Sequence, residues 1–443
     1  MLFDGQQASG QVPGAPSPTQ PSRPLLVGYF PQWGVYQGYF VRNLVESGGA
    51  GLLDQMNYAQ GFVTGGRCSV ADPNADLNFT FTAANSADGT ADVPASPFRG
   101  NFHQLAELKR RYPKLKILIS LEGRAADFAQ DAQPEAREAF VHSCVDTFLR
   151  GHFLPGVEQA PGAPPIFDGI DIDWEFPHGD DAQNFLQMLA LFRREMDRVR
   201  PGLRLAVAVG VSPRMYAGVD LGRMAALVDQ VGLMNYDYNG PWSHTTGFLA
   251  PLYTPGSDPA PGATPTGVSE EGSVQRSVAA WVSAGVPARK LLLGLPFYGY
   301  GWRDVGNADH GLFQPGRSIR GDRPYKFLAA LLADGHDDED EPDPGQAPPK
   351  PFTVYRDPRS QAPWMFTGDT VWTYEDAISV GAKIEFAREQ SMAGAMLWEL
   401  SGDTDSATLL KAARHGLDTP TDVHAADPTV AERTFDHKDG PTN

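Results

Sequence analysis

The sequence predicts an α/β protein: a (β/α)8 TIM barrel with a small α+β insertion domain between strands seven and eight. Three observations predict it. Eight short apolar runs occur along the 443 residues, segments with helical periodicity separate them, and one interval is far longer than a helix. Apolar strands that alternate with helices are typical of a parallel sheet covered on both faces. Eight such units favour a closed barrel over an open doubly wound sheet, which is the alternative.

The predicted strands share a near-continuous apolar composition. In order, they are PLLVGYF near 25, LLDQMNYAQGFV near 52, KLKILISL near 115, FDGIDIDWEF near 167, LRLAVAVGV near 203, VDQVGLMNYDY near 228, KLLLGLPFYGY near 290 and MAGAMLWEL near 392. Helical segments such as NFHQLAELKRRY after Arg99 and DAQNFLQMLALFRREMDRVR after Asp180 place apolar residues three and four positions apart.

Composition predicts the domain boundaries. The barrel is expected over 25–298 and 371–417, with the α+β insertion domain at 299–370. Residues 1–24, rich in Pro and Gly, and the polar residues 418–443 bury too little apolar area to fold and are expected to be a flexible leader and tail. The acidic run HDDEDEPDPG in the insertion is interpreted as a solvated loop, because a calcium-binding EF-hand needs Gly at its sixth position and Glu at its twelfth. We expect no metal and no cofactor.

Charge and cysteine content limit the partners. The formal net charge of -18 argues against nucleic acid and anionic membranes and suits a neutral or cationic substrate. The sequence has no apolar run of about 18 residues, so no membrane-spanning segment is expected. No secretory signal is visible at the start. Cys68 and Cys144 are too few for a disulfide framework and wrongly spaced for zinc, so they indicate no compartment.

The fourth run is unusual because acidic residues alternate with apolar ones. On a strand, the period of two puts Asp171, Asp173 and Glu175 on one face, which is the inside of a barrel, and the apolar alternates on the other. Asp168 has the opposite parity and is expected to be structural. The three inner acids rise toward the C-terminal end of the strand, where the active sites of barrel enzymes lie.

Carboxyl groups this close together inside a barrel cannot all ionise cheaply, so at least one should keep a proton near neutral pH. A carboxylic acid that stays protonated can act as a general acid. The alternatives are an ordinary strand whose acids pair with Lys or Arg, and a metal cluster. Unpaired buried acids are costly, and no His accompanies them on the strand.

At these residues the chain resembles glycoside hydrolase family 18, the chitinases. FDGIDIDWEFP is similar to the family's DxxDxDxE signature, with Asp168, Asp171, Asp173 and Glu175 at the acidic positions. GYFPQWGVYQGYFVRNL resembles the first strand and loop of the bacterial members, LMNYDYNGPW the sixth strand, LGLPFYG the seventh and GAMLWELSGD the eighth. The resemblance covers about residues 25–415 and implies the barrel with its insertion.

The resemblance also implies a mechanism in which the 2-acetamido group of the substrate attacks the anomeric carbon with net retention, an exception to the usual pair of carboxylates. Glu175 would protonate the glycosidic oxygen and later activate water. Asp173 would hold the acetamido N–H, and Asp171 would share a proton with Asp173. Tyr236 would donate a hydrogen bond to the acetamido oxygen.

Further roles follow from matching positions. Tyr29 and Ser120 would support Asp171, and Trp398 would form the floor under the sugar, since flat rings stack on the apolar faces of sugars. The remaining candidates for substrate binding are Met234, Asp237, Trp242, Trp33, Tyr36, Tyr298 and Trp302. Each aromatic residue near a strand end also has the alternative interpretation of plain core.

The chain departs from the family pattern at four positions. Glu122 replaces a Gly and Arg124 an aromatic residue after the third strand, Gln60 replaces an aromatic residue after the second, and Tyr300 replaces an Arg. Glu122 would crowd the barrel floor, raise the pKa of a neighbouring acid, or pair with Arg124. These changes bear on sugar preference more than on the chemistry.

The sequence therefore predicts a monomeric, extracellular chitinase acting on chitin or chitooligosaccharides. The alternatives are an endo-β-N-acetylglucosaminidase that cleaves N-glycans, a chitin-binding lectin without activity, and an inhibitor or structural protein on the same barrel. Such a lectin arises in this fold when the acidic Glu is lost, whereas Glu175 is present here.

Overall fold

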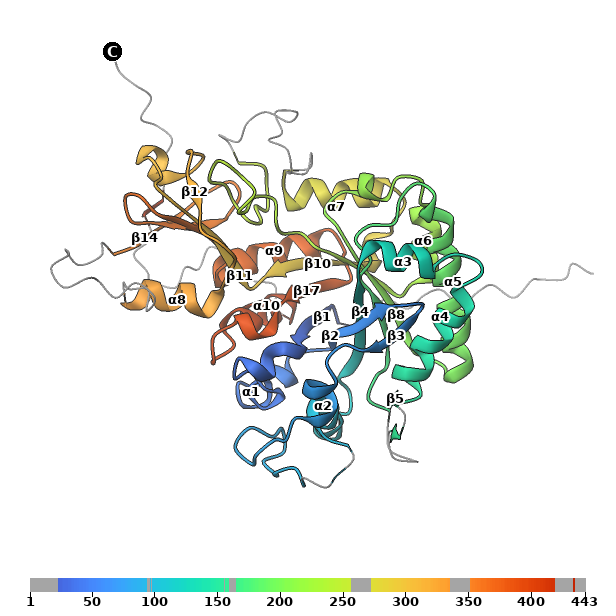
Figure 1. Cartoon of the computed structure of the whole chain (residues 1–443). Coiled ribbons are helices and arrows are strands. Elements are labelled where there is room, and N and C mark those ends of the chain that lie inside the picture. Colours follow the sequence, from blue (N-terminus) through green and yellow to red (C-terminus); the bar gives the residue numbers. More distant parts are fainter. Residues whose placement is uncertain are drawn as a thin grey trace, which may run out of the picture.

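A closed barrel of eight parallel strands is the main body of the protein in the computed structural model, which describes residues 23–93, 96, 98–154, 156–158, 165–255, 272–334, 351–418 and 433–434 (Figure 1). The sheet runs β1-β17-β10-β9-β8-β7-β4-β2, and the pairing of β1 with β2 closes it. The prediction of a (β/α)8 barrel is confirmed. Its strands are β1 Leu25–Pro31, β2 Gln55–Thr64, β4 Lys116–Gly123, β7 Gly169–Ile172, β8 Arg204–Val209, β9 Gln230–Leu233, β10 Leu291–Pro296 and β17 Gly394–Trp398.

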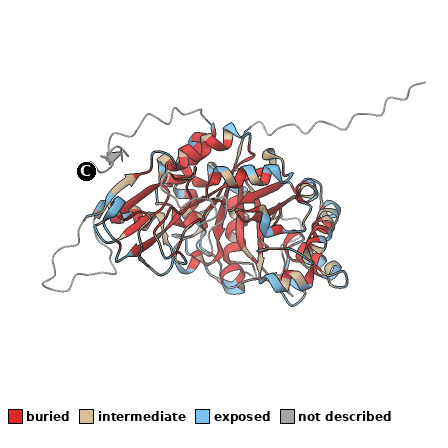
Figure 2. Cartoon of the chain, turned by 90° about the horizontal axis from the view of Figure 1, so that it is seen from above, coloured by how far each residue is buried: buried red, intermediate tan, exposed pale blue. Residues whose placement is uncertain are grey.

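Helices cover the outside of the barrel, and their buried faces are red in Figure 2. In the longest, the residues facing the sheet, such as Phe185, Leu189 and Phe192, are buried, as the spacing of its apolar residues predicts. Asp376 caps the helix before β17, because its carboxylate accepts hydrogen bonds from the backbone N–H groups of Ile378 and Ser379. The helices are α1 Val41–Glu46, α2 Gly100–Arg111, α3 Ala125–Asp131, α4 Arg137–Cys144, α5 Asp181–Val199, α6 Leu221–Leu227, α7 Val274–Ser283, α8 Tyr325–Asp334, α9 Ala377–Glu389 and α10 Thr408–Asp418.

Short helical turns occur between these elements. They are η1 Gln32–Tyr36, η2 Gly49–Gly51, η3 Asn74–Asn78, η4 Val145–Leu149, η5 Pro213–Tyr216, η6 Ala288–Lys290, η7 Ala308–Gly311 and η8 Leu400–Gly402.

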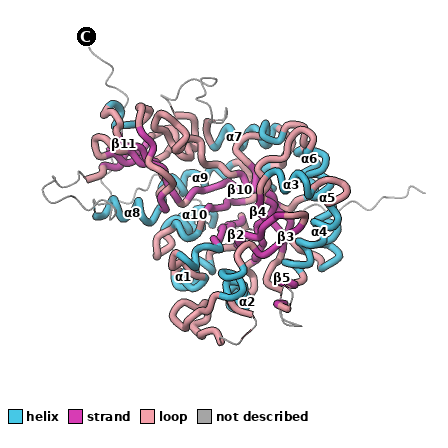
Figure 3. The backbone as a smooth tube through the Cα atoms, in the orientation of Figure 1, coloured by secondary structure: helices cyan, strands magenta, loops and turns pink. Residues whose placement is uncertain are grey.

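A second, mainly antiparallel sheet lies beside α8, and all its strands except β18 come between β10 and α9 in the sequence (Figures 1 and 3). Its strands are β11 Tyr298–Arg303, β12 Arg317–Ser318, β13 Arg323–Pro324, β14 Thr353–Arg356, β15 Pro363–Phe366, β16 Val371–Thr373 and β18 Arg433–Thr434. The first strand begins at Tyr298, and β16 pairs with both β11 and β15, so the sheet extends one residue before and three residues beyond the predicted span of 299–370. The predicted acidic loop HDDEDEPDPG, the leader before residue 23 and most of the tail lie outside the described residues.

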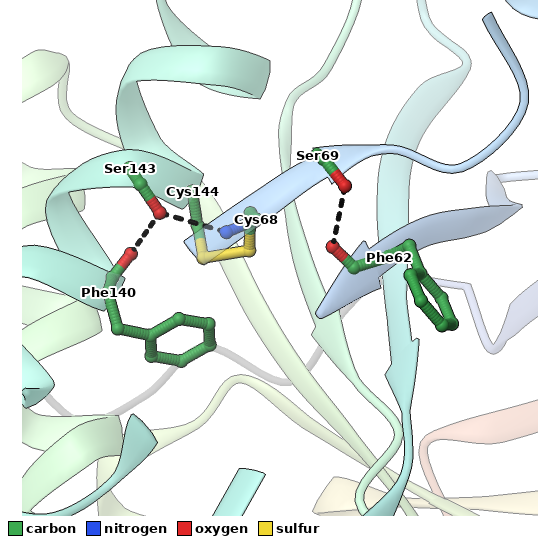
Figure 4. Close-up of a disulfide and its surroundings, with 6 residues drawn as sticks. All are labelled: Phe62, Cys68, Ser69, Phe140, Ser143 and Cys144. Atoms are coloured by element: carbon green, nitrogen blue, oxygen red, sulfur yellow. Dashed lines mark hydrogen bonds between the residues drawn. A yellow bond between two sulfur atoms is a disulfide. The ribbon is translucent and has the colours of Figure 1, made fainter. Parts of the chain in front are cut away.

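A disulfide joins the barrel's strand layer to its helices. The short strand β3 Arg67–Val70 pairs antiparallel with β2, and Cys68 on it is bonded to Cys144 at the end of α4 (Figure 4). Ser143 strengthens the junction: its hydroxyl accepts from the backbone N–H of Cys68 and donates to the carbonyl of Phe140. The remaining strands, β5 His152–Leu154 and β6 Val157–Glu158, form a separate hairpin.

Candidate active site

The acidic run straddles the C-terminal end of β7. The strand ends at Ile172, so Asp171 lies within it while Asp173 and Glu175 follow it toward the barrel mouth. The apolar alternates pack outward: Ile170, Ile172 and Trp174 belong to the core between strands and helices. The Trp174 ring stacks on Phe128 of α3 with a centroid distance of 5.5 Å. We call Asp171, Asp173 and Glu175 the acidic ladder.

Neighbouring strands hold Asp171 at the base of the ladder. The hydroxyl of Tyr29 on β1 donates to its Oδ2 at 2.7 Å, and the hydroxyl of Ser120 on β4 donates to the same oxygen at 3.0 Å. Asn57 on β2 provides a further side-chain hydrogen bond. Burial raises the pKa of Asp171, and these three hydrogen bonds oppose that rise by favouring the carboxylate. The base of the ladder is therefore fixed in position from three strands.

Asp173 is the acid that is most strongly disposed to stay protonated. Burial raises its pKa well above the usual value, and the charges of Glu175, Glu122 and Asp171 raise it further. Its Oδ1 is fully buried and has no hydrogen-bond partner among the described residues. Buried polar atoms are normally paired, so this oxygen is available to a ligand.

At the mouth, Glu175 lies within electrostatic reach of Asp237. Partial burial raises the pKa of Glu175, and the charge of Asp237, which follows β9, adds to the effect. The hydroxyl of Tyr298 donates to Asp237 Oδ1 at 2.6 Å, and Tyr300 provides a second side-chain hydrogen bond. A carboxyl group with a raised pKa near solvent suits a general acid.

Asp168 lies just before the N-terminal end of β7, and its carboxylate binds side-chain and backbone groups of the protein. Its Oδ2 accepts from Lys109 Nζ at 2.6 Å and from the backbone N–H of Ile117 at 3.0 Å. Arg200 and Lys116 lie within 3.8 Å of its other oxygen. These contacts tie β7 to α2 and β4 and leave Asp168 away from the mouth.

An aromatic and apolar cluster surrounds the ladder. It brings together six predicted site residues, which are Tyr29, Trp33, Met234, Tyr236, Tyr298 and Trp398. The Trp398 ring lies with its centroid 5.4 Å from that of Tyr29 and 6.2 Å from that of Trp33. Tyr236 lies under the electrostatic influence of all three ladder acids and of Asp237, which together with burial raises the pKa of its hydroxyl.

The outer aromatic residues differ in exposure. Tyr36 and Trp242 are 55% and 43% exposed, so both rings can meet a ligand. Trp302, by contrast, is 0% exposed within the core of the second sheet, and its indole N–H donates to the carbonyl of Ser243 at 3.2 Å. The prediction that Trp302 binds substrate is therefore wrong, because its ring is enclosed by the sheet. Tyr300 does reach the site, and its ring centroid lies 5.5 Å from that of Trp242.

The contacts of Glu122 and Arg124 test the roles that were considered for Glu122. Arg124 points to solvent and pairs with Asp127 at 2.7 Å, so the predicted alternative of a Glu122–Arg124 pair is wrong. Glu122 instead meets Gln60, whose amide nitrogen, in the orientation that satisfies both groups, donates to both carboxylate oxygens. Burial and the charges of Glu175 and Asp171 raise the pKa of Glu122 to about 7.

Sequence reasoning did not single out Asn57 or Tyr216. Asn57 has the inward parity of β2, which is a signal that a strand register would have supplied. Tyr216 in η5 lies under the charges of Asp173 and Glu175, and its hydroxyl accepts from the backbone N–H of Gly210. Nothing in its local sequence distinguishes it from a core tyrosine.

The described residues include no group of three or more His, Cys, Asp or Glu side chains placed to hold a metal ion. None of the helices described is both long and apolar enough to cross a bilayer. What the site offers is a proton-holding acid ladder beneath a ring of tyrosines and tryptophans. This combination suits proton transfer to a ligand with apolar faces and polar edges.

Comparison with known proteins agrees with this geometry. The family model of glycosyl hydrolases family 18 matches residues 25–403. The chain is 32% identical to Chitinase C of Streptomyces lividans over 86% of its length and 31% identical to Chitinase 63 of Streptomyces plicatus over 91%. It spans 57% and 62% of those two relatives, respectively.

The fold also matches a solved structure. The catalytic domain of psychrophilic chitinase B from Arthrobacter TAD20 superposes with a TM-score of 0.76 at 28% identity, covering 92% of this chain and 97% of that one. The family match extends from β1 into the residues after β17, so it includes every barrel strand. The chain belongs to glycosyl hydrolase family 18.

Proposed function

We propose that the protein is a chitinase that hydrolyses β-1,4 linkages between N-acetylglucosamine units by a retaining, substrate-assisted mechanism. The observation that carries the proposal is the state of Asp173. This acid is disposed to hold a proton, and it presents a buried oxygen without a partner among the described residues, directly between Asp171 and Glu175. An acetamido group of the substrate would supply the missing hydrogen bond.

The proposed reaction uses the ladder in sequence. Glu175 donates its proton to the glycosidic oxygen as the bond to the anomeric carbon breaks, and the acetamido oxygen of the same sugar bonds to that carbon. Asp173 accepts the acetamido N–H and stabilises the positive charge of the oxazolinium ion, while Tyr236 donates to the acetamido oxygen. Water then attacks the anomeric carbon as its bond to the acetamido oxygen breaks, which restores the acetamido group, and Glu175 takes the proton of the water. The two displacements give net retention.

The aromatic cluster supports a carbohydrate substrate. Trp398 lies beside Tyr29 and Trp33, and the exposed rings of Tyr36 and Trp242 extend the aromatic surface outward. Aromatic rings with polar edges suit the apolar faces and hydroxyl rims of sugars.

The disulfide supports an extracellular location. Cys68 and Cys144 are bonded, and disulfides persist chiefly in oxidising compartments. The pairing therefore carries information about compartment that the cysteine count did not.

A matched pair of variants tests the function. Glu175→Gln should lower the turnover of a chitin hexamer by about 10²–10⁴-fold, because the amide cannot donate the proton. Binding of the hexamer, measured by calorimetry, should persist. Glu138→Gln, an exposed glutamate on α4, is the control and should leave turnover unchanged. A wild-type protein that binds the hexamer without cleaving it, or a Glu175→Gln variant with normal turnover, would overturn the proposal.

A further inference from the structure

Glu122 and Gln60, two positions at which the chain departs from the family pattern, face each other on the inner wall of the barrel. Ser120 on β4 points inward, since its hydroxyl meets Asp171, and Glu122 two residues on has the same parity. The backbone N–H of Asp173 donates to the carbonyl of Leu121, which places Glu122 beside Asp173 on the neighbouring strand. Adjacent strands lie about 4.8 Å apart. Glu122 is therefore level with the centre of the ladder.

The register of β2 brings Gln60 to the other side of Glu122. The pairing of β2 with β4 shifts between Ala59 and Gly61, so Gln60 falls in this irregularity, two residues before Phe62, which is the register partner of Glu122. Its amide donates to both oxygens of the carboxylate, while Arg124 is occupied by Asp127 at the surface. A glutamine amide orients a carboxylate without neutralising it. The pair thus keeps an ionisable group in place at the ladder.

The surroundings of Glu122 contain acids and hydroxyl groups. From the β7 side, Glu175 and Asp171 act on Glu122, and Glu175, Glu122 and Asp171 act together on Asp173. The phenol hydroxyls that face Asp173 belong to Tyr29 on β1, Tyr216 in η5 and Tyr236 after β9. Among the described residues, no Lys, Arg or His acts on Glu122 or Asp173. An ionised Glu122 consequently adds uncompensated negative charge next to Asp173.

We propose that Glu122, held by Gln60, is a positioning residue whose ionisation keeps a proton on the acidic ladder and so extends hydrolysis to higher pH. The inference rests on the proposed function. The reaction needs one ladder proton for the leaving oxygen, and that proton is lost at the alkaline limit of activity. A further negative charge beside Asp173 opposes this loss. Glu122 itself touches neither the leaving oxygen nor the attacking oxygen in this mechanism.

The decisive variant is Glu122→Gln, which has the same shape as the protonated side chain and can never ionise. Burial and its neighbours raise the pKa of Glu122 to about 7, so the wild-type protein and the variant should have kcat/KM values within about twofold of each other near pH 5. The alkaline limb of kcat/KM should move about one pH unit lower in the variant, which is about a tenfold loss beyond the limb. Gln60→Met, which lacks the amide donors, should shift the ionisation of Glu122 upward and give an intermediate profile near pH 7.

Two controls separate a charge effect from a structural one. Asp127→Asn removes a carboxylate close in sequence that pairs with the exposed Arg124, and it should leave the pH profile unchanged. An equal loss at every pH in Glu122→Gln, or a profile that superimposes on that of the wild type, would overturn the proposal. Infrared titration of protonated carboxyl groups provides a readout without substrate: Glu122→Gln should shift the remaining ladder titration to lower pH. If the wild type cleaves no chitin hexamer, the proposed function fails, and the infrared shift still decides whether Glu122 acts on the ladder.

Discussion

Removing the hydroxyl of Tyr29 tests how the base of the ladder is held. Asp171 Oδ2 accepts from Tyr29 at 2.7 Å and from Ser120 at 3.0 Å. Tyr29→Phe deletes the shorter of these hydrogen bonds and keeps the ring beside Trp398. The remaining donors, Ser120 and Asn57, cannot replace it from their own strands. The perturbation is therefore a single lost donor at a buried carboxyl group.

The magnitude depends on whether Asp171 is charged. A hydrogen bond to a neutral acid contributes about 0.5–1.5 kcal/mol and one to a carboxylate about 1.5–3 kcal/mol. Burial raises the pKa of Asp171 in the native state above its pKa in the unfolded state. At pH values between these two pKa values, the native state binds more protons than the unfolded state. The free energy of unfolding therefore falls as the pH rises through this range. Tyr29→Phe raises the native pKa further. The decrease in unfolding free energy caused by Tyr29→Phe should therefore be about 1–2 kcal/mol larger at alkaline pH than at acidic pH.

Urea unfolding at about pH 5 and about pH 8 measures this difference. Tyr36→Phe is the matched control, because its hydroxyl donates to Asp72 at 2.6 Å on the exposed surface, where water replaces the lost donor. The control should change the unfolding free energy by less than about 0.5 kcal/mol at both pH values. Equal destabilisation by Tyr29→Phe at the two pH values would refute the reasoning about the charge on Asp171.

Two other predictions concern stability. Lys383 on α9 and Glu375 form an ion pair in which each side chain is 1% exposed. Lys383→Met should lower the unfolding free energy by about 3–5 kcal/mol in urea unfolding, because it leaves an unpaired buried carboxylate, and the double variant with Glu375→Leu should recover most of the loss. If the double variant is no more stable than the single one, the pair is not coupled. Reduction of the Cys68–Cys144 disulfide should cost about 2–5 kcal/mol and lower Tm, whereas a Cys68→Ser/Cys144→Ser variant should be insensitive to reductant; equal responses would contradict this.

The barrel was predictable because its signals are local. Each strand is a short apolar run, and the alternation in the fourth run separates Asp171 on the inside from Ile170 and Ile172 on the outside. The mouth of the barrel then follows from strand direction, since parallel strands end at the same edge. The clustering of Tyr236, Tyr298 and Trp398 in the structure follows from that geometry.

The features that sequence reasoning missed depend on contacts between distant segments. Cys68 and Cys144 are 76 residues apart, and only the packing of β3 on α4 brings them together. Trp302 shares its strand with Tyr298, but distant aromatic residues such as Phe248 and Trp364 enclose it. Local patterns of polarity carry no information about such partners.

The Glu122–Gln60 contact was likewise missed because it joins segments that are distant in the sequence. It depends on an irregularity in the pairing of β2 with β4, which no local pattern reveals. The sequence alone therefore shows that Glu122 departs from the family pattern, whereas its contact with Gln60 is visible only in the structure.

The anomeric form of the first product tests the central claim most directly. Wild-type protein mixed with a chitin tetramer or hexamer should release the β-anomer first, as recorded by proton NMR before mutarotation equilibrates the product. This result would establish retention, as the acetamide-assisted mechanism with Glu175 as the acid requires. Early release of the α-anomer would contradict the mechanism.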